Sequence, residues 1–263
     1  MPDLGSIYAS YGKGFKSGGF NAFGTREIVV RATQIGITRP EAEALVFVQD
    51  SYEKEVSDNY EVGFKLQFRD AGININGAAF WTDVSNAQQF IFFPAGSIQA
   101  VASIDEVRIK GFEIDGTARL GDQLTLFGGF GYIDPVIRSY LAQPGSVGNR
   151  MPYVSKYNIT AGFQFTQPVS STLELTTRAE YSRQGSVWFD AANLPGTKRG
   201  PTDLVNARLG LRADEWEISL WGRNLLNEEY RVESVTLVTG IGLFNPGFKA
   251  LTRSYGVEAR VRF

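Results

Sequence analysis

The chain contains no cysteine and no histidine among its 263 residues, and only two methionines. These absences exclude a disulfide framework and a zinc site built from cysteine and histidine. They also exclude every catalytic triad or dyad in which histidine is the base. The 28 acidic and 26 basic residues nearly cancel, so the basic excess of a general nucleic-acid surface is missing and no nucleic-acid partner is expected.

Long apolar runs are absent as well. No segment holds the run of about 18 apolar residues that a transmembrane helix needs. The first ten residues have neither a basic n-region nor an apolar h-region, so no signal peptide is predicted. Taken alone, these absences suggest a cytosolic protein, but the pattern of the remaining residues contradicts that interpretation.

Alternation of apolar and polar residues dominates the chain. It is strict over residues 60–68, 157–165 and 255–263. Such alternation predicts β-strands with one apolar and one polar face, because side chains on a strand point to opposite sides in turn. Weaker alternation follows in several other segments, and counting them all gives about ten strands: 7–11, 73–82, 107–120, 124–132, 173–181, 205–212 and 216–223.

The phase of this alternation reverses near Gly111. Phe112 and Ile114 carry the apolar side after this residue, whereas Val107 and Ile109 carry it before. Two explanations are open: a β-bulge at Lys110–Gly111, or a switch from a membrane zone to a wetted extension.

Connections between the predicted strands alternate in length. Short turns are expected at 69–72, 121–122, 167–170 and 213–214, and long Gly/Pro/Asn-rich loops at 14–57, 93–101, 134–153, 189–202 and 225–250. Tight turns at one end and long loops at the other are typical of an outer-membrane barrel. A soluble antiparallel sandwich, the alternative, gives no reason for this segregation and predicts solubility without detergent.

Three further features favour lipid on the apolar face. Strands of nine or more residues match the ~9–11 needed to cross a bilayer at a tilt. Aromatic residues, which include 4 Trp, 11 Tyr and 19 Phe, gather near strand ends, where girdles meet headgroups. The opposite face carries charges of both signs. The sequence therefore predicts an all-β fold, an antiparallel transmembrane β-barrel of about ten strands, which could close only around a narrow lumen.

Several segments resemble the C-terminal half of the TonB-dependent outer-membrane receptors. They occur in the family's order, and the chain ends on Phe263: Ile7–Asn21, Tyr60–Lys65, Lys110–Asp115, Asn149–Tyr153 and Asn224–Tyr230. By this resemblance, residues 1–263 are one domain, the C-terminal portion of a larger barrel. The family's plug domain, TonB-contacting box, signal peptide and N-terminal barrel strands are not found, so a fragment incomplete for coupled import is expected.

The resemblance implies a transport receptor and no enzyme. Its ligand would be a scarce nutrient, such as a siderophore, vitamin or saccharide, which the sequence does not narrow further. The expected location is the outer membrane of a Gram-negative cell, with long loops extracellular and the C-terminus periplasmic. Expected partners are membrane lipid, the missing plug and strands, and TonB through the missing part. The alternative is a stand-alone small barrel with a structural, adhesion or passive-pore role.

Charged residues on the polar strand faces are the first candidate functional group. Glu113 with Asp115, and Glu174 with Glu180, could serve as paired carboxylates in a glycosidase, but a charged, water-lined lumen with cross-strand ion pairs is favoured. The predicted lumen-facing charges are Glu113, Asp115, Glu174, Arg178, Glu180, Arg208, Arg212, Glu217, Arg223, Glu258, Arg260 and Arg262. No catalytic, cofactor-binding or metal-binding residue is predicted among them.

Apolar and amide side chains on the first and last long loops form the second group, because loops often carry the binding function of barrels. The predicted ligand-contacting residues are Phe15, Phe20, Asn21, Phe23, Phe244 and Asn245. The first loop also contains Gly12–Gly19, which superficially suggests a phosphate-binding loop. Its spacing does not fit the G-x-x-x-x-G-K-[ST] pattern, so a loop base is the preferred interpretation.

Overall fold

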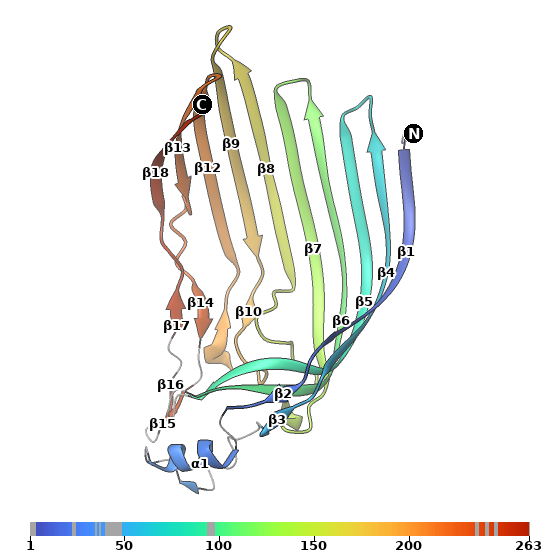
Figure 1. Ribbon diagram of the computed structural model, residues 1–263, viewed down its shortest axis with the longest axis vertical. Helices are drawn as coiled ribbons and strands as arrows, with labels where there is room; N and C mark the ends of the chain where they lie inside the picture. Colours follow the sequence, from blue (N-terminus) through green and yellow to red (C-terminus); the bar gives the residue numbers. More distant parts are fainter. Residues whose placement is uncertain are drawn as a thin grey trace.

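The computed structural model describes residues 4–22, 25–34, 36, 38–39, 49–93, 98–234, 237–239, 242–244 and 247–262. Ten antiparallel strands form one curved sheet in which each strand pairs with the next large strand along the chain (Figure 1). In order across the sheet they are β1 (Leu4–Lys16), β4 (Glu55–Phe68), β5 (Ile73–Phe93), β6 (Ile98–Leu120), β7 (Leu124–Ser139), β8 (Tyr157–Pro168), β9 (Glu174–Gln184), β12 (Thr202–Arg212), β13 (Trp216–Arg223) and β18 (Ser254–Val261). The predicted all-β, ten-stranded antiparallel sheet is confirmed.

Its two edges do not meet. Across the described residues β1 and β18 pair only with β4 and β13, so the sheet is an open wall and not a closed ring. Both chain termini lie at the same end of this wall (Figure 1). Because the strand number is even, the two edge strands run in opposite directions, as antiparallel completion of a barrel requires.

The tight turns also lie at this end, which we call the turn end. They connect β4 to β5, β6 to β7, β8 to β9 and β12 to β13, as predicted. Gly72 and Gly121 occupy two of them with φ of +66° and +65°, a left-handed conformation that glycine adopts without steric cost. The described parts of the longer connections lie at the opposite end, which we call the loop end.

Short helices and strands lie at the loop end. They are β2 (Gly19–Phe20), α1 (Thr25–Gln34), β3 (Ser51–Tyr52), η1 (Pro144–Ser146), β10 (Val187–Trp188), η2 (Pro195–Thr197), β11 (Lys198–Arg199), β14 (Arg231–Ser234), β15 (Leu237–Thr239), β16 (Gly242–Phe244) and β17 (Gly247–Lys249). Within the described ranges, no helix has the length and apolar character needed to cross a membrane.

The prediction of a long loop at 93–101 is wrong. β5 continues to Phe93 and β6 starts at Ile98, so these strands form a hairpin of 21 and 23 residues. In the half of the hairpin farthest from the turn end, apolar side chains do not alternate onto the outer face. Small side chains there, such as Ala100 and Ala102, are buried instead. An extension beyond the lipid zone has no need of an apolar outer face, so the periodic signal ends before the strand does.

The bulge predicted at Lys110–Gly111 is also wrong. The β5–β6 ladder runs through these residues without a shift, and the β6–β7 ladder shifts register between Glu106 and Val107 instead. Val107 is only 2% exposed on the inner side, whereas Phe112 is 46% exposed on the outer side. The reversal of phase therefore fits the other explanation, a change of surroundings along one continuous strand.

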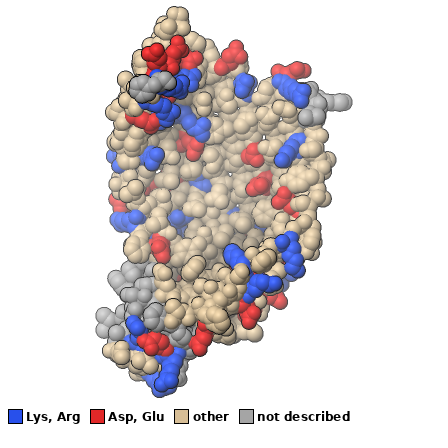
Figure 2. Space-filling model, viewed as in Figure 1, with Lys and Arg blue, Asp and Glu red and all other residues tan. Residues whose placement is uncertain are grey.

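Cross-strand register determines which residues share a face. Phe112 lies opposite Ala79 on one neighbour and Tyr132 on the other, and these side chains therefore point the same way. Continued across the sheet, the pairing puts the alternating apolar positions of the ten strands, outside the loop-end extension, on one face, which we call the outer face. The charged positions that alternate with them fall mainly on the hollow inner face (Figure 2), although a few, such as Arg108 and Lys110, are on the outer face.

A small apolar core fills the inner side at the loop end. It contains Val84 and Ala87 from β5, Ile104 and Val107 from β6, Ile137 and Tyr140 at the end of β7, and Ala191 from the β10–β11 connection. Burial raises the pKa of the Tyr140 phenol. Its hydroxyl is buried and has no hydrogen-bond partner in the part of the chain that the structure describes.

Glycines facing aromatic rings recur across the sheet. In each pair the ring covers the glycine directly opposite on the neighbouring strand, where an added Cβ would collide with it: Tyr8 with Gly63, Phe64 with Gly77, Phe80 with Gly111, Phe127 with Gly162 and Trp221 with Gly256. These contacts fill the space that a missing side chain leaves on a pleated surface.

Replacing Gly162 with alanine tests this packing. The new Cβ would lie 2.5 Å from the Ala179 carbonyl oxygen as well as against the Phe127 ring, so the backbone must shift. We expect Gly162→Ala to lower the free energy of unfolding by about 1–3 kcal/mol, as overpacking does elsewhere. Urea unfolding in detergent micelles, followed by Trp fluorescence, measures the change.

Gly131→Ala is the matched control, because Gly131 is also an inner-face strand glycine and an added Cβ there has nothing within 4 Å. Equal losses in the two variants would contradict the packing argument.

The loop-end core gives a second test. Ile137→Ala removes a side chain that is 0% exposed and should cost about 2–5 kcal/mol. Tyr140→Phe removes only a buried, unpaired hydroxyl, so we expect unchanged or slightly higher stability. The same urea titration compares the two, and a large loss in Tyr140→Phe would reveal a partner for the hydroxyl.

Candidate functional site

The predicted lumen-facing charges lie together on the inner face of the sheet. Glu113 and Asp115 are on β6, Glu174, Arg178 and Glu180 on β9, Arg208 and Arg212 on β12, Glu217 and Arg223 on β13, and Glu258 and Arg260 on β18. Arg262 lies just past β18, where its backbone N–H donates to the Glu215 carbonyl. Register alone brings most of these residues together, because every second residue of adjoining strands faces inward.

Arg208 is the centre of the largest ion-pair group. Its guanidinium lies 3.1 Å from the Glu258 carboxylate on β18 and 3.3 Å from the Glu217 carboxylate on β13. Arg260 also contacts Glu258, at 3.1 Å. The group links three strands by alternating charge, which offsets the direct pairing of Arg208 with Arg178 across the β9–β12 ladder.

Other inner-face charges are paired in the same manner. Arg212 is paired with Glu174 directly across the β9–β12 ladder. Arg178 lies 3.0 Å from Glu180 and also covers the Phe127 ring, with 4.3 Å between guanidinium carbon and ring centroid. Because both carboxylates of β9 are held by arginines, this strand forms part of a charged wall, not an acid/base pair.

The β6 carboxylates are surrounded differently. Asp115 accepts a hydrogen bond of 3.0 Å from the Asn76 amide across the β5–β6 ladder. Glu113 lies one inner-face position away from Asp115 on the same strand, opposite Ala78 and Gly131. Among the described residues, no three Asp or Glu side chains are placed to hold a metal ion.

The predicted ligand-contacting residues are dispersed. Phe15 belongs to β1 and not to a loop, and it lies on the outer face, 72% exposed. Phe20 ends β2 at the loop end and is 86% exposed. Phe244 is the last residue of β16, whereas Phe23 and Asn245 lie outside the described residues.

Asn21 has a structural task. Its amide nitrogen donates to the carbonyls of Gln49 at 2.7 Å and Val101 at 3.0 Å, and its amide oxygen accepts from the Val101 N–H at 2.8 Å. The side chain thus fastens the base of the first long loop to β6. Both ends of the amide are occupied, so little capacity is left for a ligand.

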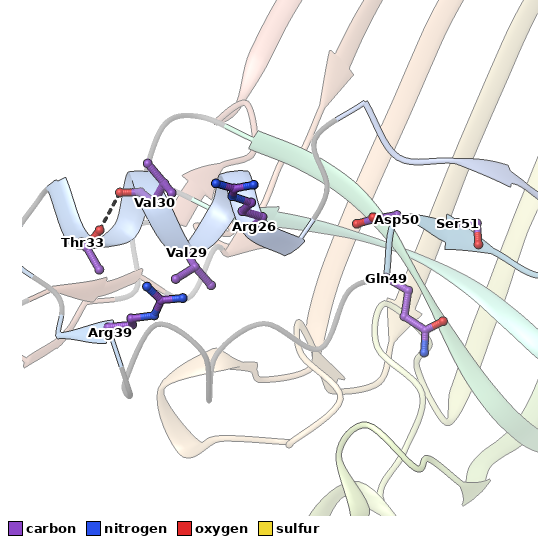
Figure 3. Close-up of a pocket in the computed structure, with 8 residues that line it drawn as sticks. All are labelled: Arg26, Val29, Val30, Thr33, Arg39, Gln49, Asp50 and Ser51. Atoms are coloured by element: carbon purple, nitrogen blue, oxygen red, sulfur yellow. Dashed lines mark hydrogen bonds between the residues drawn. The ribbon is translucent and has the colours of Figure 1, made fainter.

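A pocket of about 940 Å³ opens between α1 and the segment that leads into β3 (Figure 3). Its walls combine two guanidinium groups with hydroxyl, amide and apolar side chains: Arg26, Val29, Val30, Thr33, Arg39, Gln49, Asp50 and Ser51. Figure 3 shows that the helix residues line one side of the pocket and residues 49–51 lie across from them. No pattern in the sequence indicated this pocket.

Helix α1 was not predicted, because it lies within residues 14–57, which were expected to form an irregular loop. Its signals are short: a Glu27–Arg31 pair one turn apart, with 2.8 Å between Nε and Oε1, and the apolar residues Val29 and Ala32 on its buried side. Ten residues give too few periods to separate such a stripe from the alternation around it.

Hydrogen bonds join two other connections at the loop end. The Asn149 amide donates to the Ala191 carbonyl at 3.0 Å. The Asn193 side chain exchanges hydrogen bonds with the Arg150 backbone, accepting from its N–H at 3.1 Å and donating to its carbonyl at 3.0 Å. The β7–β8 and β10–β11 connections therefore form one ordered cap over the inner side of the loop end.

An antiparallel wall with one apolar face, one charged face and segregated turns and loops is the architecture of a transmembrane β-barrel. The sequence profile of the family described as "TonB dependent receptor-like, beta-barrel" matches residues 1–225. The chain belongs to this family, which is a family of transport receptors.

Curated relatives support the same assignment. The chain is 28% identical over 180 residues to the "Ferrichrome outer membrane transporter/phage receptor" of Escherichia coli strain K12, covering 65% of this chain and 22% of that protein. It is 27% identical over 199 residues to the "Probable TonB-dependent siderophore receptor PiuA" of Acinetobacter baumannii, covering 72% and 24%. The chain thus spans less than a quarter of the length of either relative.

Solved structures share the fold. The ferric yersiniabactin uptake receptor FyuA from Yersinia pestis matches with a TM-score of 0.75 at 20% identity, over 99% of this chain and 35% of that one. The siderophore receptor PiuA from Acinetobacter baumannii matches with a TM-score of 0.66 at 21% identity, over 97% and 33%. Near-complete coverage of this chain means that the ten-stranded wall as a whole has a counterpart in larger barrels.

Replacing Arg208 tests the inner ion-pair group. Arg208→Ala leaves the Glu217 and Glu258 carboxylates without the cation that links them, but the group is partly solvated. After allowance for solvent screening, we expect a loss of about 1 kcal/mol in the free energy of unfolding, shrinking as salt is raised. Arg223→Ala is the control, because Arg223 is near no carboxylate that the structure describes and rests on the Trp221 ring. Equal losses in the two variants, independent of salt, would show that charge pairing is not the cause.

Proposed function

We propose that this chain forms part of the barrel wall and loop end of a receptor that takes up ferric siderophores through the outer membrane of a Gram-negative cell. Membership of the family supports a transport role, and the named relatives carry iron chelates. The proposal treats residues 1–263 as one barrel unit that acts together with the further parts present in the longer relatives. Plug and TonB contact are assigned to those parts.

Orientation follows from the same proposal. The turn end would face the periplasm and the loop end the medium, since outer-membrane barrels have short periplasmic turns and longer extracellular loops. The C-terminus then lies on the periplasmic side. Ligand capture would take place at the loop end, where the pocket, Phe20 and the ordered cap lie.

The pocket supports an anionic chelate as ligand. Among the described lining residues, Arg26 and Arg39 bring two permanent positive charges to the wall, and Asp50 brings one carboxylate. Thr33, Gln49 and Ser51 add hydrogen-bond groups, while Val29 and Val30 give an apolar side. Guanidinium groups bind carboxylate or catecholate oxygens through charge-assisted hydrogen bonds, so this lining suits a charged metal chelate better than a neutral sugar.

Uptake of labelled compounds by a Gram-negative host without siderophore receptors of its own tests the proposal. The protein is expressed as its gene encodes it, and ferric hydroxamates, ferric catecholates, cobalamin and a maltodextrin are supplied separately. We expect uptake of at least one iron chelate, dependent on TonB, and none of cobalamin or maltodextrin. Uptake of cobalamin or maltodextrin alone would overturn the assignment to siderophores.

The pocket is tested by Arg26→Gln in the same assay. Loss of one guanidinium should weaken binding of an anionic chelate about tenfold, since a hydrogen bond to a charged group contributes roughly 1.5–3 kcal/mol. Lys249→Gln is the control: it removes a loop-end cation whose partner is Glu229, 2.8 Å away. Equal effects of both changes would show that general charge, not the pocket, attracts the chelate.

A further inference from the structure

A group of basic side chains lies on the outer face, where the sheet meets lipid. Arg108 and Lys110 on β6 stand beside the Trp81 ring of β5, with 4.8 Å and 4.2 Å from their charged ends to the ring centroid. Arg138, exposed where the β6–β7 ladder shifts register, is the third base. We call Arg108, Lys110 and Arg138 the outer basic cluster.

Asp83 organises this cluster. Its carboxylate accepts hydrogen bonds from Arg108 Nε at 2.8 Å and from Trp81 Nε1 at 2.9 Å. The indole and one guanidinium are thus fixed relative to each other before any ligand arrives.

The local charge stays positive after pairing. Asp134 lies across the ladder from Lys110 but is bound to Lys156 at 3.2 Å. With Asp83 engaged by Arg108, Lys110 is exposed and has no carboxylate within ion-pair distance in the described part of the chain. Glu106 lies on the same face, across the register shift from Arg138, so the four bases of this patch meet three acids and leave a net charge of +1.

The position of this cluster along the strands indicates which part of the membrane it faces. Tyr11, Tyr60 and Trp81 lie side by side in one cross-strand row, with Lys110 next in the same row. Toward the turn end, Phe112 and Ile114 continue the outer face as exposed apolar side chains, 46% and 45% accessible. Aromatic residues mark the level of lipid headgroups, and apolar side chains below them meet acyl chains.

We propose that the outer basic cluster binds the phosphate of a membrane lipid headgroup in the leaflet at the loop end. A lipid whose chains lie against Phe112 and Ile114 brings its phosphate to the height of Lys110 and Arg108. The phosphate accepts hydrogen bonds from both cations, and the Trp81 ring packs against the glycerol or sugar that carries it. The inference depends on the sheet facing lipid and is independent of which chelate is transported.

Titration of the full chain in detergent micelles with a fluorescent phosphatidylglycerol, with phosphatidylcholine as the zwitterionic comparison, tests the site. We expect tighter binding of phosphatidylglycerol, weakened by salt near 0.5 M. Lys110→Gln should raise the apparent Kd about fivefold, and the further change Arg108→Gln by a similar factor, because each base near a membrane surface contributes roughly this much. Lys110→Arg should retain the affinity.

Lys13→Gln is the matched control. Lys13 is another outer-face base at a similar height, 62% exposed, but it faces Asp58 at 3.5 Å, so this pair is neutral. Its removal should leave lipid affinity unchanged. Equal affinity for the two lipids, or equal losses in Lys13→Gln and Lys110→Gln, would overturn the proposal. Displacement of the lipid by excess inorganic phosphate would show a free-phosphate site and would overturn it as well.

Discussion

The structure depends on satisfying the backbone hydrogen bonds of strands that lie against lipid. Hydrocarbon offers no water to an exposed N–H or C=O group, so each strand of the wall must pair on both sides. The eight strands between the two edges of the described sheet do so through antiparallel ladders. Within the described residues, the edge strands β1 and β18 each leave one side unpaired, so both edges require a further partner strand in lipid. The same constraint forces strict alternation of side chains, because one face must suit lipid and the other water.

This constraint explains how much the sequence predicted. Where strands cross the lipid zone, as at Tyr60–Phe68 or Tyr157–Phe165, one face is held apolar and the period of two is plain, so strand number, turns and inner-face charges could be read directly. Beyond the lipid zone, neither face of a strand has to be apolar. Residues 83–93 and 98–106 remain β-strand while burying alanine and isoleucine on the inner side, which removed the signal and suggested a loop. The pocket beside α1 was the feature least predictable from the sequence, because it depends on contacts between distant segments.

Charge pairing differs along the height of the wall. Near the turn end, inner-face arginines and carboxylates neutralise one another across strands, as Arg208 does with Glu217 and Glu258. At the loop end, the described lining of the pocket contains Arg26 and Arg39, and the outer basic cluster lies around Trp81. The proposed ligand and lipid contacts therefore both fall at the loop end, away from the ion-paired inner wall.

The aromatic rings that cover glycines have a consequence for how the wall assembles. Because side chains alternate with a period of two, a strand displaced by one residue would turn its lipid-facing side chains inward. It would also move Phe127 away from Gly162, and Phe80 away from Gly111, onto neighbours that carry a Cβ. Each ring accepts only one alignment of its neighbouring strand. The glycines thus disfavour slipped registers within each hairpin, before the whole sheet has formed.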